Sequence, residues 1–165
     1  MQSIYLIGFM GSGKTTVADQ LGKYYQLPVQ DTDQMIEAMQ NKKIKQIFAE
    51  EGEHQFRQYE HDVLTTTESN NCIIATGGGI IEQDRNVHWL KDKQVIYLQT
   101  SWPEIVNRLK DEGDRPIWQD QNRDKEQLLL SREQKYLEAA TYVIRTDGKS
   151  IDLLVKEIIE VITTS

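Results

Sequence analysis

A glycine-rich run near the start of the chain has the composition of a phosphate-binding loop. Residues 8–15 read Gly-Phe-Met-Gly-Ser-Gly-Lys-Thr and match G-x-x-x-x-G-K-[ST] at every fixed position. Glycines let successive backbone N–H groups point at phosphate oxygens, and the following helix adds the positive end of its dipole. Lys14 can reach the β- and γ-phosphates, and the Thr15 hydroxyl can ligate Mg²⁺. The motif therefore predicts a nucleoside triphosphate with magnesium, in a kinase, a switch or a motor.

Two carboxylates, Asp31 and Asp33, follow the short apolar run 27–29. At the end of a second predicted strand they would lie beside the glycine loop, at the sheet edge where open α/β sheets bind ligands. One carboxylate could sit near Mg²⁺ and its water, and the other could accept a proton from an attacking hydroxyl. The alternative is structural, because Thr32 or Asp33 could cap a helix that begins at Gln34. The spacing leaves both interpretations open.

An arginine and a glutamate stand in a helical pattern farther along the chain. Glu60 falls inside an apolar stripe, and Arg57 precedes it by three residues, so the two are neighbours on adjacent turns. A half-buried Arg and Glu need partners. One interpretation is an isolated salt bridge that contributes little stability. The other is that Arg57 binds an anionic substrate group and is held in place by Glu60. The stripe consists of Phe56, Tyr59, Val63 and Leu64.

Three further features extend this set of chemical groups. The glycines Gly77, Gly78 and Gly79 end an apolar run, where they would allow close backbone approach to a ligand at the cost of conformational entropy. Arg115 lies in a polar segment, about 110–126, whose composition predicts a mobile lid over a transferring phosphoryl group or a plain solvated loop. Arg132 and Tyr136 are four residues apart on a predicted helix. They could form a second anion-binding site, or they could simply lie on the protein surface.

The elements that must position these residues alternate along the chain. Continuous apolar runs are typical of strands buried on both faces of a parallel sheet, and helical periodicity fills the intervals between them. The pattern predicts an α/β fold with a mostly parallel sheet and right-handed crossovers. Ser101 and Glu104 form a capping-box pattern before another helix, and a closing amphipathic helix follows residue 150. The apolar runs are 4–7, 72–75, 95–98 and 142–144.

Composition excludes several classes of function. The chain has 165 residues and a net charge of −7, so we expect a single domain, residues 1–165, that binds neither nucleic acid nor an anionic membrane. No apolar run approaches the roughly 20 residues that span a bilayer. The single cysteine, Cys72, lies in an apolar run and predicts a buried small side chain in a reducing compartment. We expect a cytoplasmic monomer.

Taken together, these elements resemble shikimate kinase, a family of small P-loop kinases. The resemblance runs from Ile4 to the last helix and rests on the order and spacing of the motifs rather than on the glycine loop alone. It implies a three-layer α/β/α fold with a five-stranded parallel sheet, a substrate-binding segment at about 31–61 and a lid at about 110–126. The motifs are Asp31-Thr32-Asp33, Phe48, Gly52-Glu53, Phe56-Arg57, Glu60, the glycine triplet, Arg115-Pro116 and Arg132 with Tyr136.

The resemblance implies that ATP phosphorylates the 3-hydroxyl of shikimate, in aromatic amino-acid biosynthesis, with Mg²⁺ as cofactor. Asp33 would bind the shikimate hydroxyls and is the candidate for activating the attacking one. Arg57 and Arg132 would hold the carboxylate, with Glu60 positioning Arg57, and the glycine triplet would line the pocket. Thr15 and Asp31 would serve the magnesium. The residues implied in ATP binding are Gly11, Ser12, Gly13, Lys14, Thr15, Thr16, Arg108 beside the adenine and Arg115 on the lid.

The chain departs from the family pattern after Arg115-Pro116, where Ile117 and Trp118 replace two leucine-like residues. The adenine region near 146–149 is too variable for residues to be carried over. The closest rival hypotheses are another small-molecule P-loop kinase, such as a gluconate or nucleoside monophosphate kinase, and a nucleotide-dependent switch. Convergence of two arginines with Glu60 suits a carboxylated polyol better than a nucleotide. A GTP switch should carry an Asn-Lys-x-Asp-type motif, which the chain lacks.

Overall fold

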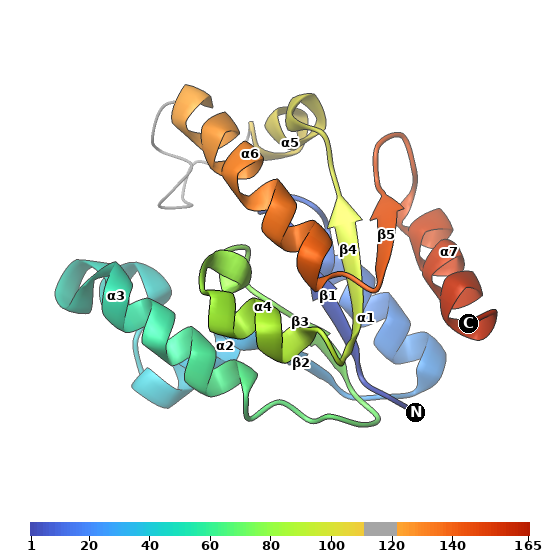
Figure 1. The fold of residues 1–165 in the computed structure, drawn as a ribbon, viewed down its shortest axis with the longest axis horizontal. Helices are drawn as coiled ribbons and strands as arrows, with labels where there is room; N and C mark the ends of the chain where they lie inside the picture. The colour runs from blue at the N-terminus through green and yellow to red at the C-terminus, as the bar shows by residue number, and fades with distance from the viewer. Residues whose placement is uncertain (111–121) are drawn as a thin grey trace.

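A five-stranded parallel sheet forms the centre of the protein, as the alternating pattern predicts. The computed structural model describes residues 1–110 and 122–165. The strands lie in the order β2-β3-β1-β4-β5. Helices cover both faces of the sheet, so the predicted three-layer α/β/α architecture is confirmed (Figure 1). The strands are β1 (Ile4–Ile7), β2 (Val29–Asp31), β3 (Ile73–Ala75), β4 (Gln94–Gln99) and β5 (Tyr142–Arg145).

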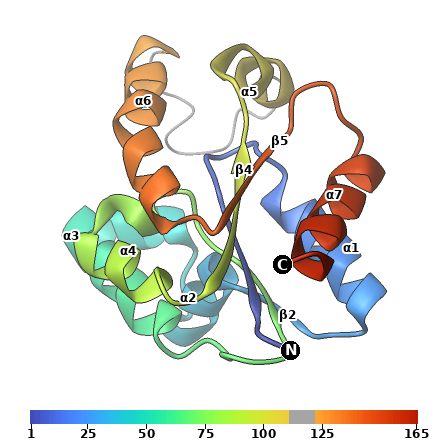
Figure 2. The same ribbon diagram turned by 45° about the vertical axis from the view of Figure 1, so that its right-hand side comes forward.

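The helices form the two outer layers. Helices α1 (Lys14–Tyr25) and α7 (Ile151–Thr163) pack on one face of the sheet. Helices α4 (Asp84–Leu90) and α6 (Asn122–Ala139) pack on the other, and Figure 2 shows the two layers on either side of the strands. None of the described helices is long and apolar enough to cross a membrane. The remaining elements are α2 (Thr32–Gln40), α3 (Ile44–Leu64), the 3₁₀ helix η1 (Ile80–Glu82) and α5 (Trp102–Leu109).

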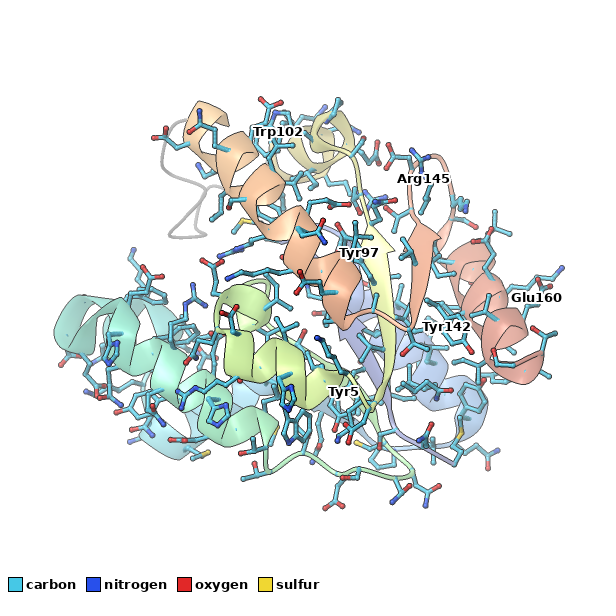
Figure 3. All side chains as sticks on the ribbon, viewed as in Figure 1. Tyr5, Tyr97, Trp102, Tyr142, Arg145 and Glu160 are labelled. Carbon is cyan, nitrogen blue, oxygen red and sulfur yellow. The ribbon has the colours of Figure 1, made fainter. Side chains whose placement is uncertain are left out.

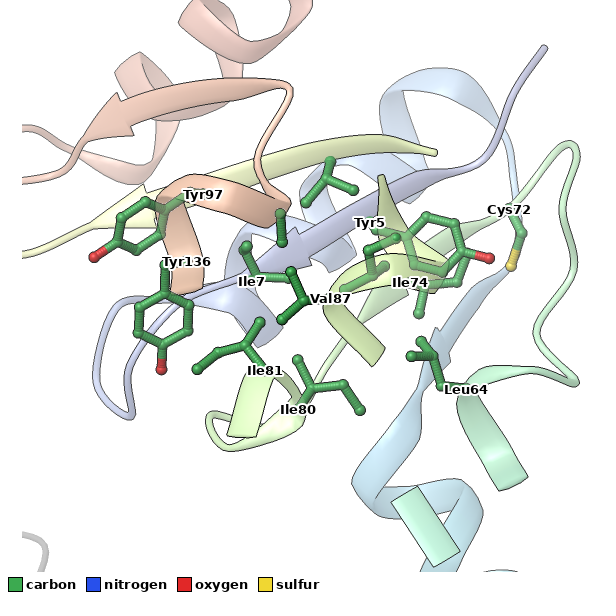
Figure 4. Packing of buried hydrophobic residues seen from close by; sticks show 13 residues of the cluster. Tyr5, Ile7, Leu64, Cys72, Ile74, Ile80, Ile81, Val87, Tyr97 and Tyr136 are labelled. Atoms are coloured by element: carbon green, nitrogen blue, oxygen red, sulfur yellow. The ribbon is translucent and has the colours of Figure 1, made fainter. Parts of the chain in front are cut away.

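Alternate residues of the central strands supply the two halves of the core. Ile4 and Leu6 of β1 face α1 and α7, whereas Tyr5 and Ile7 face α4 and α6. All four side chains are fully buried, which explains why β1 is a continuous apolar run rather than an alternating one. Cys72 is buried in the Tyr5 half of this core, as predicted (Figure 4).

The strand order places a crevice at the carboxyl end of β1. The connection after β1 runs through α1 on one face towards β2, whereas the connection after β4 runs through α5 and α6 on the other face towards β5. Connections that leave neighbouring strands in opposite directions open a crevice between their carboxyl ends. The glycine loop follows β1 and therefore lies at this crevice, as the sequence predicts.

Local hydrogen bonds correct two of the sequence predictions. Asp31 ends β2 and caps α2, because its backbone is still extended and its Oδ1 accepts the Gln34 N–H at 3.1 Å. Neither Thr32 nor Asp33 is the cap, so the Asp33 carboxylate is not used to cap the helix. Ser101 caps α5 as predicted, but Glu104 binds Arg108 instead of completing the capping box.

Helix α3 contains a break that the sequence analysis did not predict. Gly52 has φ 86° and ψ 168°, a conformation that interrupts the helix and that a side chain would strain. The chain therefore changes direction between the part before Gly52 and the part that carries Arg57 and Glu60. Apolar residues of α2 and of both parts of α3 pack together beside the sheet, at the left of Figure 1.

Candidate active site

A cleft of about 630 Å³ opens at the carboxyl end of the sheet. Residues from the glycine loop, α1, the end of β2, α3, the glycine triplet, α5 and α6 line it. Nearly all the site residues predicted from the sequence are among them. Ser12 is buried behind the wall, and Arg115, with Ile117 and Trp118, lies outside the described residues. The predicted residues in the wall are Gly11, Gly13, Lys14, Thr15, Thr16, Asp31, Asp33, Arg57, Glu60, Gly77, Gly78, Gly79, Arg108 and Arg132.

The glycine loop wraps around the N-terminus of α1. Gly11 and Gly13 have φ values of 83° and 97°, which favour glycine, and Gly13 is the N-cap. Lys14 Nζ donates to the carbonyl oxygens of Gly8 at 2.5 Å and Phe9 at 3.1 Å. The side chain thus lies over the loop, where a cation, backbone N–H groups and a helix N-terminus together suit a polyphosphate.

Oxygen ligands for a hard cation flank this loop. Thr15 is in the first turn of α1, and the Asp31 carboxylate uses only Oδ1 to cap α2. No group of three or more acidic, histidine or cysteine side chains that could hold a metal occurs within residues 1–110 and 122–165. Mg²⁺ in phosphate-transfer sites is held by one or two protein oxygens together with substrate phosphates and water, so this donor set fits it.

Asp33 also lines the cleft, and one oxygen of its carboxylate lacks a hydrogen-bond partner in the part of the chain that the structure describes. Its Oδ1 is buried without a hydrogen bond among the described residues. Burial and the neighbouring Asp31 carboxylate raise the pKa of Asp33 to about 6, against the opposing pull of Lys14 and Arg57. A buried acceptor without a donor costs free energy. Asp33 is therefore suited to receive a hydrogen bond from a ligand.

Arg57 and Glu60 form the pair that the sequence predicts. Arg57 Nη1 lies 2.7 Å from Glu60 Oε1, and Glu53 adds a second carboxylate at 3.4 Å. Glu60 is only 1% exposed, and burial raises its pKa to about 7 although the Arg57 guanidinium acts in the other direction. Both side chains also line the cleft. The pair is therefore held in place rather than a loose surface contact.

The glycine triplet makes room for these two side chains. A Cβ atom at Gly77 would lie 2.5 Å from Asp33 Oδ1, and one at Gly79 would overlap the Arg57 guanidinium, with Cζ 2.8 Å away. At Gly78 the nearest atom would be the Met10 nitrogen at 3.4 Å, an ordinary contact. From the sequence, these glycines are expected to admit a ligand. In the structure, Gly77 and Gly79 make room for side chains that line the cleft.

Arg132 enters the cleft from α6 and is almost completely buried. Its side chain is 2% exposed, with the guanidinium Cζ 5.6 Å from the centre of the Phe9 ring. Tyr136, one turn later, is also buried, and its hydroxyl donates to the Gly78 carbonyl at 2.6 Å. The alternative that these residues decorate the surface is wrong. Tyr136 also stacks on Tyr97 of β4, which joins α6 to the sheet (Figure 4). Figure 3 labels Tyr97 among the side chains of the whole molecule.

Arg108 braces the glycine loop from α5. Its Nη1 donates to the Gly11 carbonyl at 3.0 Å, and its Nη2 reaches the Thr146 hydroxyl at 3.3 Å. Glu104 holds its Nε at 3.0 Å. Arg108 therefore joins the loop after β1 to the turn after β5, beside the phosphate-binding end of the cleft.

Comparison with known proteins decides the family. Residues 10–163 match the family model described as shikimate kinase. A shikimate kinase of Bacillus cereus (strain AH187) is 42% identical over 161 residues, which cover 97% of this chain and 98% of the relative. This chain belongs to the shikimate kinase family.

Solved structures of the family have the same fold. Shikimate kinase from Acinetobacter baumannii in complex with shikimate is 35% identical, with a TM-score of 0.90 over 99% of this chain and 94% of that one. The enzyme from Aquifex aeolicus is 30% identical, with a TM-score of 0.86 over 98% and 96% of the two chains. The P-loop kinase fold expected from the resemblance is therefore confirmed.

Several cleft residues of this shikimate kinase family member had no role in the sequence analysis. The apolar wall near Arg57 includes Phe48 and Phe56, whose ring centres are 4.7 Å apart. Their helical spacing resembles ordinary core packing, so periodicity alone does not distinguish a cleft wall from a core. The other cleft residues without a predicted role are Met10, Ile44, Thr76 and Leu109.

Proposed function

We propose that this protein transfers the γ-phosphoryl group of ATP to the 3-hydroxyl of shikimate, giving shikimate 3-phosphate and ADP in aromatic amino-acid biosynthesis. The observation that carries the proposal is the convergence of Asp33, Arg57 and Arg132 on one cleft with the glycine loop. Family membership supports it, as does the solved relative whose title names shikimate as its ligand. An acceptor that is both anionic and hydroxylated suits this combination of side chains.

The acceptor half of the cleft would hold shikimate at its carboxylate end and at its reacting end. Arg57, held by Glu60 at 2.7 Å, and the buried Arg132 bind the carboxylate, because guanidinium groups recognise carboxylates through paired hydrogen bonds. Glu60 positions Arg57 and hydrogen-bonds the substrate. Gly77, Gly78 and Gly79 let the substrate lie against the backbone of the turn, which excludes water from the reacting end.

Asp33 would orient the attacking hydroxyl. With a pKa raised to about 6, it is a carboxylate at neutral pH and accepts the hydrogen bond that its buried Oδ1 lacks. It then takes the hydroxyl proton as the phosphoryl group arrives. A loose transition state requires the proton to leave late, so correct orientation contributes more than basicity.

The donor half would hold the nucleotide. Lys14 turns from the carbonyls of Gly8 and Phe9 to the phosphates, joined by the backbone of Gly11, Ser12 and Gly13 and by the hydroxyl of Thr16. Thr15 and Asp31 would hold Mg²⁺. When bound, the ion would neutralise charge on the phosphate oxygens.

Two further arginines complete the proposal. Arg108 lies along the adenine while it braces the loop, and Arg115 stabilises the transferred group from the lid at about 110–126. We infer that the enzyme acts as a cytoplasmic monomer with a single domain, residues 1–165, and a substrate segment at 31–61. The net charge of −7 supports the inference that it binds neither nucleic acid nor membrane.

One assay tests the proposal. The purified protein with Mg-ATP is offered shikimate, gluconate or a nucleoside monophosphate, and ADP release is measured. We expect ADP release above background with shikimate alone, and loss of turnover in the folded Lys14→Ala variant. Background rates with shikimate would overturn the proposal, and turnover of another acceptor would identify the rival kinase. Normal turnover in Lys14→Ala would refute the role of the loop.

A further inference from the structure

Glu82 lies directly behind the arginine that enters the cleft from α6. It is the last residue of η1, three residues after Gly79. Its Oε1 lies 3.5 Å from Arg132 Nε, and its backbone carbonyl accepts Lys135 Nζ at 2.9 Å. Because residues 132 and 135 are adjacent on one face of a helix, two contacts hold Glu82 against α6.

Arg132 needs a compensating charge. A guanidinium that is 2% exposed has lost most of its hydration, which is costly unless an opposite charge lies nearby. Within residues 1–110 and 122–165, Glu82 is the carboxylate that forms an ion pair with Arg132, and the Arg132 Nε has no hydrogen bond. Glu82 therefore supplies attraction to one edge of the guanidinium.

The opposite edge of Arg132 faces the cleft. Its Nη1 lies near Gly78, 3.7 Å from the place of a Cβ there, and the residue lines the cleft beside Arg57. Arg57 is likewise held by a glutamate, Glu60 at 2.7 Å, although Glu60 lines the cleft itself whereas Glu82 does not.

We propose that Glu82 is a positioning residue that holds Arg132 with its Nη groups directed at the substrate carboxylate, and so sets the affinity for the acceptor. The inference rests on the proposed function, in which Arg132 binds that carboxylate. Glu82 itself does not line the cleft. It acts through the orientation of Arg132 rather than by touching the substrate.

Glu82→Gln tests the proposal because it keeps the shape and the acceptor oxygen but removes the charge. We expect KM for shikimate to rise about tenfold, or about 1.4 kcal/mol, with kcat and KM for ATP changed less than twofold. Asp84→Asn is the matched control, because Asp84 is 95% exposed, pairs with Lys135 rather than Arg132, and carries the same charge two residues away. It should leave every constant unchanged.

A double-mutant cycle separates positioning from general support of the fold. In an Arg132→Met background, Glu82→Gln should lower kcat/KM for shikimate by less than twofold. An equal loss in both backgrounds, or an unchanged KM in Glu82→Gln, overturns the proposal. If Glu82→Gln does not fold, Glu82→Asp replaces it, with a smaller rise in KM and the same dependence on Arg132. If the wild-type protein does not phosphorylate shikimate, the proposed function itself has failed.

Discussion

At the scale of single residues, the acceptor site consists of charged side chains that are largely buried. Asp33 and Glu60 are buried carboxylates with raised pKa values, and Arg57 and Arg132 are buried or half-buried cations. Burying such groups lowers the stability of the fold, and they cluster where a ligand supplies the missing partner. Their arrangement therefore reflects binding more than stability.

The raised pKa of Asp33 predicts an acid limit to activity. Protonation of Glu60, with a pKa of about 7, weakens its hold on Arg57, and protonation of Asp33 removes the acceptor for the attacking hydroxyl. The value of kcat/KM for shikimate should therefore begin to fall near pH 7 and fall more steeply below about pH 6. An aspartate with its ordinary pKa of 3.8 would lose activity only near pH 4. Initial rates between pH 5 and pH 8.5 at saturating Mg-ATP measure the profile. A flat profile down to pH 5, with the protein still folded, would contradict the assignment.

Asp33→Asn tests the raised pKa in a second way, through stability rather than activity. The folded-state pKa lies above the unfolded value, so ionisation of Asp33 costs stability as pH rises from about 4 to about 6. The asparagine variant should therefore be inactive yet melt at a higher temperature than the wild type at pH 8. Its stability advantage should shrink as the pH falls below the folded-state pKa.

The crowding at Gly79 predicts that a side chain added there would weaken shikimate binding. In Gly79→Ala the methyl group would displace the Arg57 guanidinium, so shikimate affinity should fall by a factor of ten or more while ATP affinity is retained. Gly78→Ala is the comparison, because its Cβ would meet nothing closer than 3.4 Å. Calorimetric titration with each ligand measures the difference. Equal loss of shikimate binding in both variants would rule out displacement of Arg57 as the cause.

At the scale of elements, α3 is positioned by side chains from the segment after the glycine triplet. Buried Asn86 of α4 donates to the Ile80 carbonyl at 2.9 Å, which directs its Oδ1 to His61 Nδ1 at 2.7 Å. His61 must then donate from Nδ1. Gln83 also donates to the Arg57 carbonyl at 2.6 Å. The helix that carries Arg57 and Glu60 is thus tied to the turn that makes room for them.

Asn86→Ala should loosen this attachment. Two hydrogen-bonding groups would lose their buried partner, so we expect a loss of about 2–3 kcal/mol in the free energy of unfolding and a higher KM for shikimate. Thr65→Ala, which removes an exposed hydroxyl bonded to its own helix, should cost less than about 0.5 kcal/mol. Urea denaturation measures both. A stability loss in Asn86→Ala without any change in KM would show that α3 does not depend on this contact for its position.

Most elements could be predicted from the sequence because their signals are local. The apolar runs located four of the five strands closely, the run 27–29 predicted β2 about two residues early, and helical periodicity located α1 and α7. The break at Gly52 could not be predicted, since a glycine in a helical pattern is compatible with a continuous helix. The cap at Asp31 was missed because the strand continues through that residue, and only its backbone conformation distinguishes it from Thr32 and Asp33.

At the scale of the whole molecule, a protein with a net charge of −7 binds anions by concentrating cations in one cleft. Lys14, Arg57, Arg108 and Arg132 come from four different elements and meet there. Their residue types and motif spacing made them predictable one by one. The Glu82 carboxylate beside Arg132 was not predictable, and neither was the place of Phe48 and Phe56 in the cleft wall, because both depend on tertiary packing.

Binding at a site shared by so many elements should stabilise the whole fold. Each substrate at about 100 times its Kd adds about 2.7 kcal/mol, or about 5–10 °C in Tm for a domain of this size. Arg57→Ala should lose the shift caused by shikimate and keep the shift caused by Mg-ADP, as differential scanning fluorimetry can measure. Loss of both shifts would indicate that Arg57 supports the fold rather than the substrate.

The crowding at Gly77 and Gly79 also limits how the protein can escape an inhibitor. A compound bound between the glycine triplet and α3 would commonly be excluded by a mutation that adds bulk to the wall. At these two positions any added side chain would instead displace Asp33 or Arg57, so the resistant protein would also be impaired. Resistance should therefore arise at other residues of the cleft wall, such as Ile44 or Phe48.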